Sequence, residues 1–147
     1  IFQALASPRL EIERVEVTAV GDETWRVDVG IANTGYLPTT VTRWAAMHQL
    51  VRPVVAELEL GAGTGTGTAH TVDGPGRGVA IVGGGANRQT LGQLAGYSQA
   101  RFADHNDGTP NRALASWLVT GSDGSTIEVV ARHQRAGVAR ATITLDH

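Results

Sequence analysis

Two stretches near the start of the chain alternate apolar and polar residues, and this pattern limits the fold more than any other feature. Residues 10–18 alternate apart from one slip at residues 14–15, and residues 25–32 alternate again after a turn at residues 21–22. A period of two places every second side chain on the same face of a β-strand. The two stretches therefore predict an antiparallel pair with one buried face and one face in water.

Short apolar segments separated by turn residues continue along the chain. Further strands are predicted over residues 52–60, 79–82, 90–94, 113–120, 126–133 and 139–145. Residues 122–124 predict a hairpin between two of these strands, and Ala136-Gly137 predicts another. Seven or eight short strands with frequent turns indicate an all-β, immunoglobulin- or fibronectin-III-like antiparallel sandwich with one short helix. Trp25 and Trp117 fall on the apolar stripes and are predicted to anchor its core.

The segment after the second strand predicts a turn followed by the short helix. Gly35 is expected to adopt a left-handed backbone conformation there. Thr39 or Thr40 is expected to cap a helix over residues 41–49. Two other stretches, residues 61–68 and 103–112, have the composition of loops.

Length and charge exclude several classes of function. A chain of 147 residues suits one domain that folds without disulfides, and it contains no cysteine. A net charge of −2 gives no electrostatic attraction to nucleic acid or to anionic lipid. No apolar run approaches the roughly 20 residues that a membrane helix needs. Because the first residue is Ile1, residues 1–8 are interpreted as a linker remnant from an upstream domain and residues 9–147 as the sandwich.

Three segments imitate functional motifs, and each lacks a residue that its motif requires. Residues 79–85 resemble a dinucleotide-binding strand and glycine loop, but Arg88 stands where the third small residue belongs. Residues 104–108 suggest a calcium loop, but Ala115 occupies the position of its final glutamate. His70 has no third ligand that the sequence predicts, and no Gly-x-Ser-x-Gly occurs. We therefore expect no catalytic residue, no metal ligand and no cofactor site in this chain.

One segment is too specific for ordinary turn chemistry. Residues 33–42 read Asn-Thr-Gly-Tyr-Leu-Pro-Thr-Thr-Val-Thr, which resembles a segment in the C-terminal region of bacterial M14-class zinc carboxypeptidases. Residues 7–12, 91–96 and 117–137 are similar to the same region. The resemblance implies a C-terminal accessory β-sandwich behind a metallopeptidase domain. It places zinc in that upstream domain, because the family's His-x-x-Glu ligands do not occur here.

The resemblance implies that the chain stabilises or orients its own upstream peptidase domain, without catalysis and without nucleic acid or membrane as partner. Tyr36, Leu37, Pro38 and Trp44 form the candidate docking corner, although packing inside the sandwich is the simpler interpretation for these side chains. An exposed apolar patch is expected near residues 1–5. The alternative is an adhesion-type or carbohydrate- and cell-wall-binding module that uses the 103–112 loop for recognition.

Overall fold

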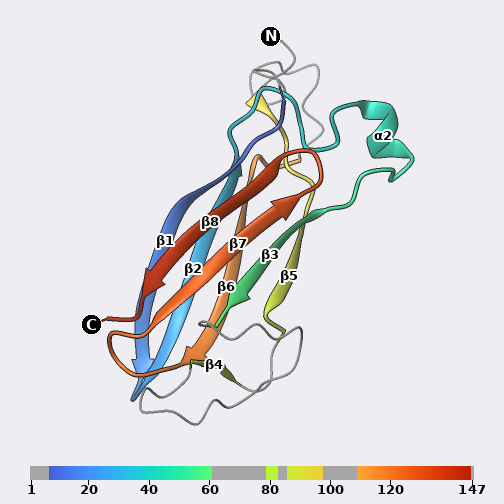
Figure 1. Ribbon diagram of the computed structural model, residues 1–147. Helices are drawn as coiled ribbons and strands as arrows, with labels where there is room; N and C mark the ends of the chain where they lie inside the picture. Colours follow the sequence, from blue (N-terminus) through green and yellow to red (C-terminus); the bar gives the residue numbers. More distant parts are fainter. Residues whose placement is uncertain (1–6, 61–78, 83–85, 98–108, 147) are drawn as a thin grey trace.

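Two four-stranded antiparallel sheets pack face to face, which confirms the predicted all-β sandwich (Figure 1). The computed structural model describes residues 7–60, 79–82, 86–97 and 109–146. The first sheet has the order β1 (Leu10–Gly21), β2 (Thr24–Asn33), β6 (Arg112–Thr120), β4 (Ala80–Ile81). The second has the order β5 (Arg88–Gly92), β3 (Val54–Glu59), β7 (Thr126–His133), β8 (Gly137–Thr144).

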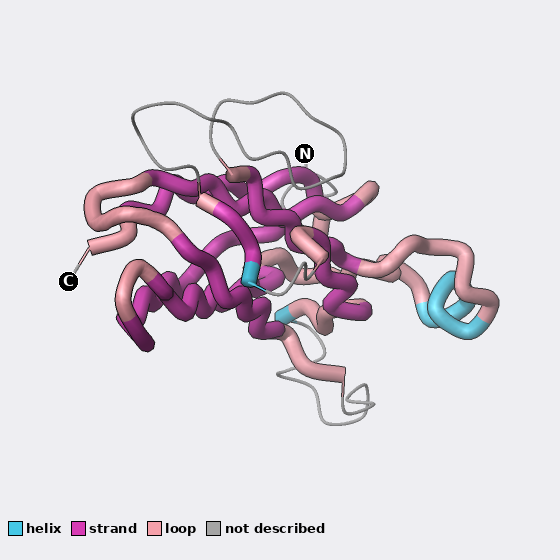
Figure 2. Tube along the Cα trace, turned by 90° about the horizontal axis from the view of Figure 1, so that it is seen from below, coloured by secondary structure: helices cyan, strands magenta, loops and turns pink. Residues whose placement is uncertain are grey.

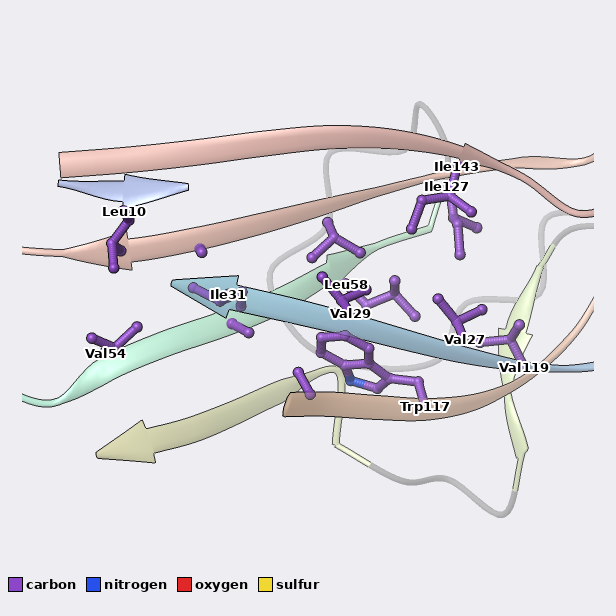
Figure 3. Close-up of a cluster of buried hydrophobic side chains, with 14 of the residues drawn as sticks. Leu10, Val27, Val29, Ile31, Val54, Leu58, Trp117, Val119, Ile127 and Ile143 are labelled. Atoms are coloured by element: carbon purple, nitrogen blue, oxygen red, sulfur yellow. The ribbon is translucent and has the colours of Figure 1, made fainter. Parts of the chain in front are cut away.

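The core lies between the sheets and is built from alternating residues of the central strands (Figure 3). In β2, Trp25, Val27, Val29 and Ile31 are at most 1% exposed, because each points to the same face of the strand. Partners of the same kind come from β3, β6 and β7, among them Trp117 at 4% exposure. The two tryptophans are therefore core residues, as the sequence predicts.

The pairing of β1 with β2 explains the slip in the sequence pattern. The register of the two strands shifts between Ile12 and Arg14, so that Glu13 is an extra residue in β1. A β-bulge of this kind interrupts the alternation and lets it resume in the opposite phase. The predicted pair is confirmed, and the slip is its bulge.

The predicted hairpin at residues 122–124 is wrong, although the turn itself is present. Gly124 has a φ of +85°, but β6 pairs with β2 and β4 while β7 pairs with β3 and β8. Since both edges of β6 are already paired, the chain crosses to the other sheet after Thr120. The Trp25 indole N–H donates to the Gly121 carbonyl (2.9 Å) at this crossing. The hairpin of β7 with β8 is confirmed, with Gly137 at a φ of +81°.

The helix between β2 and β3 is shorter than predicted. It is α2 (Arg43–Met47), and its N-cap is Thr42, whose hydroxyl accepts a hydrogen bond from the Ala45 N–H (3.1 Å). Thr39 and Thr40 are not caps, because Val41 adopts a φ of +67° and delays the helix. A β-branched residue in this region is strained by about 1–2 kcal/mol. Figure 2, which is turned by 90° from Figure 1, shows that the helix projects to one side of the strands.

Several predicted features fall outside the part of the chain that the structure describes. These are the patch near residues 1–5, the loop over residues 61–68, the glycine triplet at residues 83–85, the calcium-like segment 104–108 and His70. Within the described residues, no helix has the length and apolar character to cross a membrane.

Candidate functional site

Asn33 is the centre of a hydrogen-bonded corner at the end of β2. Its side chain is buried, and its Oδ1 accepts hydrogen bonds from the N–H groups of Arg9 (2.9 Å) and Gly35 (3.0 Å). Its Nδ2 donates to the carbonyls of Leu37 (2.9 Å) and Ala95 (3.3 Å). One amide therefore ties the start of β1, the turn after β2 and the segment after β5. The sequence interpretation placed Asn33 at the end of a strand and did not detect this role.

Two glycines let these three segments approach one another closely. A Cβ on Gly35 would lie 2.2 Å from the Ser7 carbonyl oxygen, and one on Gly96 would lie 2.3 Å from the Leu37 carbonyl carbon. Real Cβ atoms do not come so close to backbone atoms. The expectation that Gly35 takes a left-handed conformation is wrong, because its φ is not positive. Glycine is required at position 35 because any side chain there would clash with the neighbouring backbone.

Thr39 joins the same corner to the segment that follows β5. Its N–H donates to the Leu94 carbonyl (2.9 Å), and its Oγ1 accepts from the Leu94 N–H (2.9 Å). The Thr39 hydroxyl also bonds to Gln93 Oε1 (2.7 Å). Residues 7–12, 33–42 and 91–96 therefore meet at one end of the sandwich.

Five large apolar or aromatic side chains project from this corner or from the helix beside it. Their exposed fractions lie between 43% and 74%: Tyr36, Trp44, Met47, Leu50 and Tyr97. We call these five residues the corner surface. The rings of Tyr36 and Tyr97 lie 6.5 Å apart, and the Trp44 ring lies 4.5 Å from that of His48. Of the four predicted docking residues, Tyr36 and Trp44 are exposed and do not pack in the core, while Leu37 and Pro38 are half-buried.

Four of the five residues of the corner surface, all but Tyr97, lie on a segment of low charge. Residues 36–50 contain one charged residue, Arg43. Depletion of charge together with aromatic and methionine side chains is typical of the centre of a protein interface. In contrast, no group of three metal-binding side chains occurs within residues 7–60, 79–82, 86–97 and 109–146.

The fold perturbs the ionisation of His133. Its Nδ1 accepts hydrogen bonds from the N–H groups of Arg135 (3.1 Å) and Ala136 (3.2 Å) in the β7–β8 turn. Its Nε2 is buried and has no hydrogen bond to another described residue. Burial lowers the pKa of His133, the Arg52 backbone opposes this shift in part, and the Arg135 charge adds to it. Its role is to hold the turn.

We expect the stability of the chain to fall as pH drops below about 6.5, the ordinary pKa of histidine. The unfolded chain then binds a proton that folded His133 resists, so the free energy of unfolding decreases until pH reaches the lowered pKa of the folded state. Urea unfolding at several pH values measures this slope. In His133→Gln the slope should shrink, and an unchanged slope would contradict the assignment.

Comparisons with known proteins give one family, and the solved structures that match include two distant likenesses. Residues 9–144 match the family described as Domain of unknown function (DUF8731). The archaellum periplasmic stator protein FlaG from Sulfolobus acidocaldarius is 7% identical, with a TM-score of 0.39 over 92% of this chain and 99% of FlaG. Beta-glucosidase 3B from Thermotoga neapolitana is 13% identical, with a TM-score of 0.32 over 95% of this chain and 16% of the glucosidase. No curated protein matches the sequence significantly. At these TM-scores neither likeness indicates a function.

Proposed function

The chain belongs to the family described as Domain of unknown function (DUF8731), and we propose that it is a non-catalytic β-sandwich domain that binds a neighbouring folded domain. The contact is made by the corner surface. The observation that carries the proposal is the exposure of Trp44 (64%) and Met47 (74%) on a helix that projects from the sandwich. Large apolar side chains cost free energy when they remain in water, and their grouping marks an interaction site.

The backbone of the corner is held by hydrogen bonds, so a partner that binds the corner surface would be kept in one orientation. Four hydrogen bonds of Asn33 fix the backbone on which Tyr36 stands, and the Gly96 contact holds Leu37 from the other side. A backbone that is already held in one conformation loses little further conformational entropy when a partner binds. The corner can therefore position a neighbour at small entropic cost.

The neighbour that we propose is a zinc carboxypeptidase domain joined ahead of the sandwich, where it would be stabilised or oriented by the contact. Support comes from the similarity of residues 33–42 to that family's C-terminal region. Three of the four similar segments, residues 7–12, 33–42 and 91–96, also meet in one corner. The start of β1 also lies in this corner, since the Arg9 N–H bonds to Asn33. A domain joined there would lie beside the corner surface. Zinc and the catalytic residues would belong to that domain.

A second candidate is a carbohydrate- or cell-wall-binding module. The observation in its favour is the exposed pair of Tyr36 and Tyr97, because aromatic faces at a surface can cover the apolar face of a sugar ring. This candidate requires the isolated chain to bind glycans or cell-wall material, and it requires Tyr36→Ala to abolish that binding.

We expect Trp44 to be shielded when the neighbouring domain is present. Trp25 and Trp117 are 1% and 4% exposed, so Trp44 is the tryptophan that acrylamide can quench in the isolated chain. In the longer polypeptide that joins a second domain to this chain, quenching of Trp44 should be lost. Trp44→Ala should weaken the contact between the separated parts by about thirtyfold, as expected for an interface anchor of about 2 kcal/mol.

A matched pair of leucines provides the control. Leu50 on the corner surface and Leu114 on β6 are 56% and 60% exposed. Leu50→Ala should weaken the contact, whereas Leu114→Ala should leave it unchanged. Equal effects of the two variants, or a Trp44 that remains fully quenchable in the longer polypeptide, would refute this docking surface. Glycan binding by the isolated chain would favour the second candidate.

A further inference from the structure

The four strands that form the sheet edges differ in how they are protected against pairing with other chains. In the first sheet β4 has two residues, and β1 is broken by its bulge and carries four charged residues around it: Glu11, Glu13, Arg14 and Glu16. In the second sheet β5 has five residues and a register shift opposite Val54-Val55. Short length, bulges and charge are the usual devices that prevent edge pairing. These three edges are blocked.

The fourth edge, β8, has none of these devices. It has eight residues and an unbroken register with β7, from His133↔Gly137 to Thr126↔Thr144. It contains no proline and one charged residue, Arg140. Three of its outward side chains are β-branched and exposed: Val138, Thr142 and Thr144. Such a strand has the length and composition to accept a further strand.

Among the described residues, the outer edge of β8 is paired with no other strand. The first sheet reaches this edge at the start of β1, where the Leu10 N–H donates to the Ala136 carbonyl just before β8 begins (3.1 Å). An open groove lined by residues 9–12 and 136–141 runs beside the strand. The backbone N–H and C=O groups on this side can therefore be reached by a second strand.

We propose that β8 pairs antiparallel with β8 of a second copy of this chain, which joins two sandwiches across a twofold axis. Two registers share the fullest overlap, seven residues, with either Arg140 or Ala141 on the axis. We propose the one that places Ala141 there. Val138 then lies opposite Thr144, and Arg140 lies opposite Thr142. Because a twofold contact is self-complementary, each of these pairs occurs twice.

Charge favours this register and this partner. A register centred on Arg140 would place two arginines opposite each other, which is destabilising. In the proposed register Arg140 of the second copy faces the short Thr142, and Glu128 lies directly behind Thr142 in β7. Glu128 already accepts a hydrogen bond from Arg140 of its own chain (3.2 Å). The carboxylates of Glu128 and Glu59 lie on this face and can thus form ion pairs with Arg140 of both copies.

Two substitutions at position 142 test the pairing. Thr142→Arg places like charges opposite each other twice and should weaken the dimer by roughly tenfold. In Thr142→Glu the new carboxylate would lie opposite Arg140 of the second copy, and the dimer should become stronger by a similar factor. Within one copy Glu128 would attract an arginine at position 142, whereas Arg140, two residues away on the same face, would repel it. Urea unfolding of each variant measures the net effect on the monomer. A dimer weakened in Thr142→Arg while the stability of the monomer is unchanged is assigned to the pairing of β8.

Sedimentation equilibrium over a range of concentrations measures all three proteins. A single-cysteine variant tests the register, since the natural chain has no cysteine. Ala141→Cys should form a disulfide-linked dimer on oxidation, because residues opposite each other in antiparallel strands lie about 4.5–5.5 Å apart at Cα. Val138→Cys should not. A chain that is monomeric at every concentration, a dimer indifferent to both Thr142 variants, or failure of Ala141→Cys to cross-link would each overturn the proposal.

Discussion

Gly96→Ala is expected to lower the free energy of unfolding by about 3 kcal/mol, although it adds a single methyl group. The new Cβ would lie 2.3 Å from the Leu37 carbonyl carbon and 2.4 Å from the Tyr36 carbonyl oxygen. Both are backbone atoms, so no side chain can rotate away to make room. The corner would have to open, and the Tyr97 N–H to Gly35 carbonyl bond (3.0 Å) beside it would be strained.

Thermal and urea unfolding measure this change, and Gly21→Ala is its control. A Cβ on Gly21 would meet its nearest neighbour, Thr24 Cβ, at an ordinary 3.8 Å. That variant should remain within about 0.5 kcal/mol of the natural chain. For a chain of this size the Gly96 variant should unfold roughly 6–12 °C earlier. Equal stability of the two variants would mean that residues 36–37 and 96 are not in contact.

Asn33→Ala is expected to lower the free energy of unfolding by about 4 kcal/mol, which is the largest effect that we predict. The substitution leaves two N–H groups, of Arg9 and Gly35, and two carbonyls, of Leu37 and Ala95, without their shared partner. Each buried group left without a hydrogen bond costs about 1–3 kcal/mol, and water that enters the corner recovers part of this. Urea unfolding measures the loss.

Asn33→Asp separates the hydrogen bonds from the packing. The carboxylate keeps the two bonds that Oδ1 accepts, but its second oxygen faces the carbonyls of Leu37 and Ala95. At neutral pH this variant should be about as unstable as Asn33→Ala. Acidification protonates the carboxyl and restores one donor, so its stability should rise relative to Asn33→Ala, in which the contribution of His133 is the same. No relative gain at low pH would contradict the role of Nδ2 as a donor.

The strands could be predicted from the sequence because their signal is local. The alternation in β2 identifies the residues of the core, and the slip at residues 14–15 coincides with the bulge of β1. Which strands pair with each other depends on contacts that are distant in the sequence, so it cannot be predicted from a local pattern. Residues 122–124 contain good turn chemistry, yet the turn leads across the core, because β2 and β4 already occupy both sides of β6.

The corner could be predicted in part. The unusual order of residues in 33–42 drew attention to the segment, and Tyr36 and Trp44 are exposed there. Their part in docking stays a prediction. No local pattern could reveal why particular residues stand at these positions. Asn33 meets Ala95 across 62 positions, and Gly96 is needed because of atoms in residues 36–37. The helix was also predicted too long, since nothing in the sequence indicates the positive φ of Val41.

The long-range hydrogen bonds of the corner also determine when the corner surface can exist during folding. The β1–β2 and β7–β8 hairpins join neighbouring segments, and hairpins of this kind close in about 1–10 μs. The corner instead waits for contacts across 24, 55 and 62 positions, from Arg9 to Asn33, Thr39 to Leu94 and Asn33 to Ala95. Such contacts form late, because loop-closure entropy must be overcome first. An incompletely folded chain would therefore lack the rigid corner, and a partner that recognises it would select chains whose sandwich is complete.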